Sequence, residues 1–236
     1  MFSYNNRWRR MLPEKKERQQ ITMLDIFHVH TYRCCHAENV SDEVFIQKAL
    51  ELGADRITFT DHAPFPGDIF FNRMQYEQLP EYVGTLEQLK RKYEGQILVR
   101  IGLEIEYLPS FQSYYEELAG MLDLLMIGQH FFEEAPGQYS FSLPGQQELE
   151  YPGCMEAMLR GIETNLFQVV AHPDRVFRRI KRWNQDCEEK SRELISLAKS
   201  KDVILEKNLS SMRHKNYYRG ESDYGIYSQH DERGLN

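Results

Sequence analysis

A series of polar residues at the ends of short apolar runs constrains the fold of this 236-residue chain most strongly. Each of several runs that could form a buried strand has a histidine or a glutamate at, or just beyond, its C-terminal end. These residues are His28, His62, Glu104, His130 and His172. Core packing alone gives no reason to place a polar side chain at each of these ends. A metal cluster is the economical explanation, because imidazole and carboxylate groups are common ligands of divalent ions.

The apolar runs alternate with segments of helical periodicity, which is the pattern of a parallel sheet wound by helices. Because a helix connects each strand to the next, the strands should be parallel, with right-handed crossovers and their C-terminal ends at one edge. The scattered strand-end residues should therefore meet in space. We expect strands at 24–29, 56–60, 97–105, 124–128, 167–171 and 203–208, and helices at about 41–52, 76–93, 110–121, 153–163 and 185–200.

The length suits one domain, since single α/β barrels commonly reach it. We place this domain at residues 23–212, after a flexible extension over 1–22 and before an atypical, disordered tail over 213–236. Translation could start at Met1 or at Met23. Within the domain, the longest irregular stretch is expected at about 131–150; it follows His130 and would either cover the site or form a plain surface loop.

The extension mixes basic and acidic residues and lacks the apolar centre of a secretory signal, so we expect a cytoplasmic protein. No apolar stretch approaches the ~18 residues needed to cross a bilayer, which argues against membrane insertion. The net charge of −7 and the pI of 5.7 argue against nucleic-acid binding through broad phosphate neutralisation. A small substrate is the better expectation, and no particular oligomeric state is predicted.

The first two expected strands carry most of the candidate ligands. His28 and His30 are two residues apart on a strand, so their side chains should point to the same side and share one ion. His36 lies in the loop that follows. Asp61 precedes His62 at the end of the second strand, where its carboxylate can either bind an ion or hydrogen-bond an imidazole and fix its tautomer.

Glu104 ends the third expected strand, and its two oxygens could bridge two ions as an imidazole cannot. One isolated histidine would be better explained as a solvated or core residue. Six histidines and a glutamate at strand ends favour a metal site. Cys34 and Cys35 could act as soft ligands beside His36, but buried small residues with reduced thiols are the preferred interpretation.

These motifs resemble the PHP (polymerase and histidinol phosphatase) superfamily over about residues 23–212. The resemblance lies in HxHT at 28–31, His36, TDH at 60–62, GLE at 102–104, the strand end at His130 and HPD at 172–174. It implies a distorted (β/α)7 TIM-like barrel with two or three divalent ions (zinc, manganese or iron) that hydrolyses phosphoesters. By the same resemblance, His28, His30 and Glu104 hold one ion; Glu104, His130 and His172 a second; and His36 and His62 a third.

Within that family the chain is most similar to PHP-type histidinol-phosphatases, through FFNRMQYEQLPEYV, GLEIEY, GQHFF and LEKNLSS. The likeness implies hydrolysis of L-histidinol phosphate in histidine biosynthesis. Glu104, Asp61 and Asp174 are the carboxylates assigned to catalysis, with Asp174 orienting a histidine. Arg73 is a candidate substrate contact or a solvated arginine at a helix start. Arg175 is the preferred phosphate contact in a basic cluster that also contains Arg178, Arg179, Lys181 and Arg182.

The family closes its site with a DxH motif on the last strand, and residues 213–236 contain none. We therefore expect a barrel lacking its last βα unit, through truncation or a frameshift, rather than a substitute ligand such as Asp223 or His230. Three alternatives stay open: a catalytically impaired PHP domain, a binding module, and a PHP phosphoesterase acting on another small phosphate or a nucleotide. An amidohydrolase is disfavoured because no lysine at a strand end could serve as a carbamylated bridge between two ions.

Overall fold

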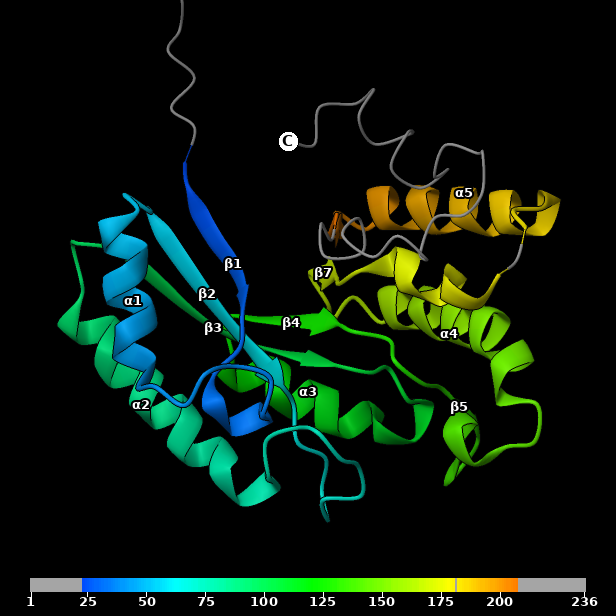
Figure 1. Cartoon of the computed structure of the whole chain (residues 1–236), viewed down its shortest axis with the longest axis horizontal. Coiled ribbons are helices and arrows are strands. Elements are labelled where there is room, and N and C mark those ends of the chain that lie inside the picture. Colours follow the sequence, from blue (N-terminus) through cyan, green and yellow to red (C-terminus); the bar gives the residue numbers. More distant parts are fainter. Residues whose placement is uncertain (1–22, 181, 208–236) are drawn as a thin grey trace, which may run out of the picture.

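Six parallel strands form one sheet in the computed structural model, which describes residues 23–180 and 182–207. The sheet is curled into a half barrel with the strand order β1-β2-β3-β4-β7-β8, so β1 and β8 are its edges (Figure 1). The strands are β1 (Asp25–Val29), β2 (Arg56–His62), β3 (Leu98–Ile105), β4 (Leu124–Ile127), β7 (Val169–Val170) and β8 (Ile204–Leu205). The expected parallel α/β architecture is confirmed.

A helix lies between each pair of consecutive strands of this sheet, as the alternation predicts (Figure 1). Gly53, at φ 75°, follows the first helix and marks the expected stop. The last helix begins where the Asn184 side chain accepts a hydrogen bond from the Cys187 amide. The helices are α1 (Asp42–Glu51), α2 (Leu79–Lys92), α3 (Gln112–Met121), α4 (Gln146–Glu163) and α5 (Gln185–Ser200).

The region between β4 and β7 is more regular than the sequence suggests. Two short strands, β5 (Glu133–Ala135) and β6 (Gln138–Tyr139), form an antiparallel ribbon within the stretch expected to be irregular. Helix α4 begins at Gln146, seven residues before the expected start. The earlier start places Pro152 inside α4, a position that proline ordinarily disfavours. The expected boundaries of the N-terminal extension and the C-terminal tail fall outside the described residues.

Alternation along β3 separates the two faces of the sheet. Val99, Ile101, Leu103 and Ile105 belong to the main core, which fills the space between the sheet and the helices. Glu104, on the opposite face of the same strand, therefore projects to the inner side of the half barrel. A smaller apolar cluster lies apart from the main core: Leu124, Met126, Val169 and Ala171, with Phe27 packed against them.

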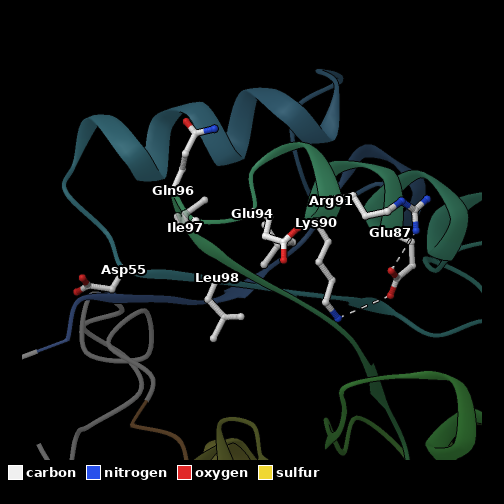
Figure 2. A pocket seen from close by; sticks show the side chains of 10 residues that line it. Asp55, Glu87, Lys90, Arg91, Glu94, Gln96, Ile97 and Leu98 are labelled. Carbon is white, nitrogen blue, oxygen red and sulfur yellow. Dashed lines mark ion pairs between the residues drawn. The ribbon is translucent and has the colours of Figure 1, made fainter.

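A groove lies at the N-terminal edge of the sheet, between the end of α2 and the start of β3 (Figure 2). Its charged residues include Lys90, which pairs with Glu87 and with Asp123. None of the candidate site residues lines this groove. Among the described residues, no helix combines the length and apolar character needed to cross a membrane.

Arg33 ties the loop after β1 to the first turns of two helices. It lies in the 3-10 turn η1 (Tyr32–Cys34) and donates from Nη1 and Nη2 to both oxygens of Asp42, at 2.8 and 2.9 Å. Its Nε and Nη2 also donate to Glu81. The side chains of Arg33 and Asp42 are each 1% exposed. Removing the guanidinium would therefore leave a buried carboxylate without this partner.

The substitution Arg33→Met should lower the free energy of unfolding by about 3–5 kcal/mol, because breaking a buried ion pair strands its partner. Urea unfolding followed by circular dichroism measures the loss. Arg91→Met is the matched control: Arg91 is 68% exposed and faces Glu87 within one helix. The control should change stability by less than about 0.5 kcal/mol. Equal urea midpoints for the two variants would contradict the conclusion that the buried Arg33–Asp42 pair stabilises the fold.

Candidate metal centre

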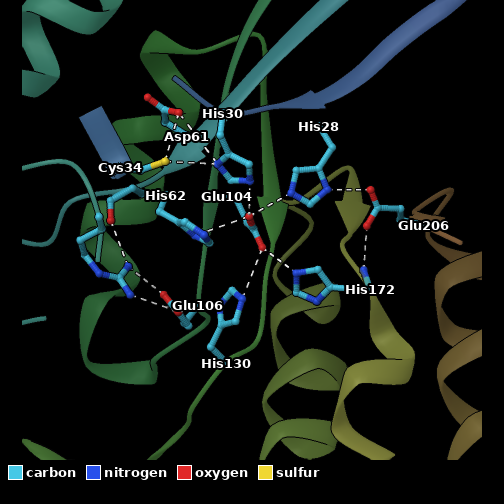
Figure 3. Close-up of polar contacts among 12 residues, drawn as sticks. His28, His30, Cys34, Asp61, His62, Glu104, Glu106, His130, His172 and Glu206 are labelled. Carbon is cyan, nitrogen blue, oxygen red and sulfur yellow. Dashed lines mark hydrogen bonds and ion pairs between the residues drawn. The ribbon is translucent and has the colours of Figure 1, made fainter. Parts of the chain in front are cut away.

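The buried Glu104 carboxylate lies at the centre of five imidazole rings (Figure 3). Its side chain is 1% exposed. Oε2 lies 3.0 Å from His28 Nε2, 3.4 Å from His30 Nε2 and 3.5 Å from His62 Nδ1. Oε1 lies 2.9 Å from His172 Nε2 and 3.8 Å from His130 Nε2. The strand ends therefore bring together the histidines and the glutamate that the sequence analysis placed there.

The backbone of β1 reaches this centre through an irregularity rather than through regular alternation. His28 has a φ of 63°, in the left-handed region, and the register between β1 and β2 shifts between Ile26 and Val29. The expectation that His28 and His30 share a face of a regular strand is therefore wrong in its cause. Both rings still face Glu104, with centroids 5.0 Å apart.

His36 lies at the periphery of the cluster, with its ring centroid 4.7 Å from that of His62 and 6.1 Å from that of His30. The expected pairing of His36 with His62 is geometrically available. Burial, followed by the nearby His30, lowers the pKa of His36. Cys34 is buried and Cys35 is exposed. Burial raises the pKa of the Cys34 thiol to about 12, which keeps it protonated.

Asp61 lies on the far side of His30 from Glu104. It accepts hydrogen bonds from the backbone amide and the hydroxyl of Thr31, and the Cys34 thiol donates to it at 3.5 Å. The Nδ1 atom of His30 is 3.9 Å from this carboxylate, while Nε2 faces Glu104. Both roles open to Asp61 stay predictions, because 3.9 Å is longer than a hydrogen bond and the carboxylate also belongs to a set of potential metal ligands with His30 and Cys34.

Arg73 lies behind His130 and is connected to it through a second buried glutamate. His130 Nδ1 is 2.9 Å from Glu106 Oε1, and Arg73 donates to both oxygens of Glu106, at 3.0 and 3.2 Å. Burial raises the pKa of Glu106, but Arg73 and His130 outweigh it and lower the value to about 2. The Arg73 side chain is 7% exposed and lies near the rings of Phe65, Phe70 and Phe131.

The other sequence candidates lie just after β7. Asp174 is buried in the 3-10 helix η5 (Pro173–Arg179), which begins next to His172. Arg175 is 23% exposed, with Nη1 3.5 Å from the His130 carbonyl and 3.7 Å from Glu150. Arg178 and Arg182 are exposed. Lys181 lies outside the described residues.

Two contacting glutamates were missed by sequence reasoning, although a signal for each was present. Glu106 is two positions beyond Glu104 in the same run, so it continues the inward-facing side of β3. Glu206 directly follows β8, just as the predicted ligands follow their strands. Its Oε1 is 2.6 Å from His28 Nδ1, and its Oε2 accepts the His172 backbone amide at 2.9 Å.

The electrostatics of the centre divide its histidines into two kinds. Burial lowers the pKa of His28, yet its hydrogen bonds to Glu104 and Glu206 outweigh this and raise the value to about 10. For His62, burial prevails and lowers the pKa to about 3, so its imidazole is neutral. Burial raises the pKa of Glu104, but the bonds from His172 and His28 hold it well below its usual range.

The residues present fit divalent ions. Three sets have potential ligand atoms within 4.8 Å of one another: His28, His30 and Glu104; His30, Cys34 and Asp61; and His62, Glu104 and His130. His172 Nδ1 is buried without a hydrogen-bond partner among the described residues. Nitrogen and oxygen donors of this kind suit zinc, manganese or iron. A Cβ on Gly128 would overlap the Glu104 side chain, so the glycine makes room for the carboxylate.

A family model described as the PHP domain matches residues 27–210. A probable histidinol-phosphatase from Deinococcus radiodurans is 36% identical over 99 residues, which are 41% of this chain and 37% of that protein. The histidinol-phosphatase of Bacillus subtilis is 31% identical over 114 residues, which are 44% of this chain and 42% of that protein. The matched segments thus span less than half the length of these relatives.

The crystal structure of a histidinol phosphate phosphatase from Lactococcus lactis has a similar fold, with a TM-score of 0.64. The superposition covers 87% of this chain and 78% of that one, at 20% sequence identity. That protein was crystallised with zinc, L-histidinol and phosphate. At this identity the likeness establishes the fold, and it agrees with the half-barrel sheet described above.

Replacing Gly128 by alanine should displace the Glu104 carboxylate and weaken zinc binding by about 100-fold, the upper range for disturbing groups that support a metal ligand. Competition titration against a chromogenic chelator measures the affinity. Gly84→Ala is the control, because a Cβ there meets no atom within 4 Å. It should leave zinc binding unchanged and stabilise α2 by about 0.5–1 kcal/mol. Equal zinc affinity in both variants would contradict the conclusion that Gly128 makes room for the Glu104 carboxylate.

Proposed function

The chain belongs to the PHP domain family, and from that premise we propose that it is a metal-dependent phosphomonoesterase acting on L-histidinol phosphate. The observation that carries the proposal is the buried Glu104 carboxylate, with histidines from several strand ends around both its oxygens. The names of the two relatives support the substrate, as does the ligand set of the Lactococcus structure. A cytoplasmic location in histidine biosynthesis belongs to the same proposal.

We assign two or three divalent ions, zinc, manganese or iron, to the clustered side chains. His28, His30 and Glu104 would hold the first ion, His130 and His172 would share the second with Glu104, and His36 with His62 would hold the third. When bound, such ions supply Lewis acidity, which activates water and neutralises charge on a phosphoryl group. The protein's part is to hold neutral imidazoles and an ionised carboxylate in fixed positions, as the low pKa values of His62 and Glu104 favour.

Residues around this cluster give the phosphate a place to bind. Arg175 carries a partly exposed guanidinium beside the His130 carbonyl, so it is the group we assign to the phosphoryl oxygens. Arg73 would reach a substrate only by exchanging its pair with Glu106; in the structure it keeps Glu106 ionised behind His130. Asp61 is assigned to orient His30, which it faces at 3.9 Å, and Asp174 is assigned to orient His172 from the start of η5.

Purified protein supplied with zinc or manganese should release phosphate from L-histidinol phosphate. His28→Ala and Glu104→Gln should each lower kcat/KM by about 100-fold or more, because even residues that merely support a metal ligand contribute 10–100-fold. Glu193→Gln, a change on the exposed side of α5, should leave the rate unchanged. A phosphate-release assay with and without chelator makes the measurement.

A parallel assay with a phosphomonoester that lacks the imidazole separates substrate from mechanism. Hydrolysis of that ester alone, still sensitive to chelator, would reject the histidinol assignment and keep the metal-dependent reaction. Activity that survives both chelation and His28→Ala would reject the reaction class itself.

A further inference from the structure

Glu206 joins the two edge strands of the half barrel. It follows β8 directly, and its carboxylate reaches His28 in β1 as well as the chain segment after β7. Oε1 lies 2.6 Å from His28 Nδ1, and Oε2 accepts a hydrogen bond of 2.9 Å from the His172 backbone amide (Figure 3). One carboxylate therefore contacts two of the candidate metal ligands, from different strands.

Both of those histidines have unusual backbone conformations. His28 has φ 63° and His172 has φ 32°, in the left-handed region that residues with a Cβ disfavour. Such conformations persist at functional sites where the surroundings over-determine them. Glu206 contributes to that restraint at each position, through the ring of His28 and through the backbone of His172. The two strained residues then present their Nε2 atoms to opposite oxygens of Glu104.

We propose that Glu206 is a positioning residue that fixes the tautomer of His28 and holds His172 in its left-handed conformation. The inference rests on the proposed function in one respect: the Nε2 lone pairs are taken to face a metal ion. An ionised carboxylate accepts hydrogen bonds and donates none. When a metal ion replaces the proton on the Glu104 side, His28 must therefore keep its remaining proton on Nδ1, which leaves the Nε2 lone pair for the ion. Glu106 stands in the same relation to His130.

The substitution Glu206→Gln inverts this arrangement without changing the size of the side chain. The His172 backbone amide can only donate, so the single oxygen of glutamine must turn toward it. The side-chain amide then faces His28 Nδ1 and donates to it, which forces the imidazole proton onto Nε2. That proton occupies the position from which a ligand lone pair is needed. Glu206→Ala lacks this effect, because it leaves His28 free to adopt either tautomer.

The tautomer can be read directly from protein in which the histidine ring nitrogens are labelled with 15N. In zinc-free wild-type protein His28 Nδ1 should be protonated, and in Glu206→Gln it should have lost that proton. The His28 signal is identified by its absence from His28→Gln. Zinc affinity should fall by about 100-fold in Glu206→Gln and by about tenfold in Glu206→Ala, within the range for residues that support a metal ligand.

Glu193→Gln, an exposed change on α5, is the matched control and should bind zinc like the wild type. A denaturation curve for each variant establishes that it is folded. The proposal fails if Glu206→Gln keeps the Nδ1 proton or binds zinc like the control. It also fails if alanine weakens zinc binding as much as glutamine or more, because Glu206 would then act as a ligand or as a general support. Wild-type protein that binds no zinc would reject the proposed function, while the tautomer comparison would still decide the role of Glu206.

Discussion

The burial of the Glu104 carboxylate is the constraint on which the arrangement of the half barrel depends. An ionised carboxylate removed from water costs several kcal/mol unless charges and hydrogen bonds replace its hydration. Here the replacement comes from His28, His30, His62, His130 and His172, which are supplied by strands spread across the whole sheet. Gly128 leaves the room that the side chain requires. A change in the pairing of any of these strands would therefore disturb the contacts that stabilise the Glu104 carboxylate.

The sequence predicts that the strand-end residues converge because parallel strands place all their C-terminal ends at one edge of the sheet. Once a helix separates each pair of strands, every C-terminal end must lie at the same edge, so Glu104 and His172 meet although 68 residues separate them. Local irregularities are less accessible. The residues around His28 give no sign of its left-handed backbone, since alternation on a regular strand also predicts that His28 and His30 face the same side. The expected helix over 153–163 begins too late, because α4 starts at Gln146 and contains Pro152, although proline disfavours helix interiors.

Carboxylates behind the imidazoles are the part of the site that sequence reasoning identifies least well. The chain has 36 acidic residues, and most acidic residues are expected to be surface charges, so Glu106 and Glu206 do not stand out. Their positions are informative only when the strand faces are known. Arg73 illustrates the same limit: a basic residue near a phosphatase-like motif suggests a substrate contact, whereas the structure pairs it with Glu106, which in turn contacts His130.

The charges of these groups explain why the histidines behave so differently. Glu104, Glu106 and Glu206 all have lowered pKa values, and the contacts of the described residues place one guanidinium, that of Arg73, beside Glu106. The three carboxylates therefore carry more negative charge than this guanidinium offsets before any histidine is protonated. His28 lies between two carboxylates, which stabilise its protonated form and raise its pKa to about 10. His62 is buried beside other imidazoles and stays neutral. Protons and divalent cations thus compete for the same carboxylates and imidazole nitrogens. Binding of a cation at Glu104 should therefore displace the proton that His28 holds on that side.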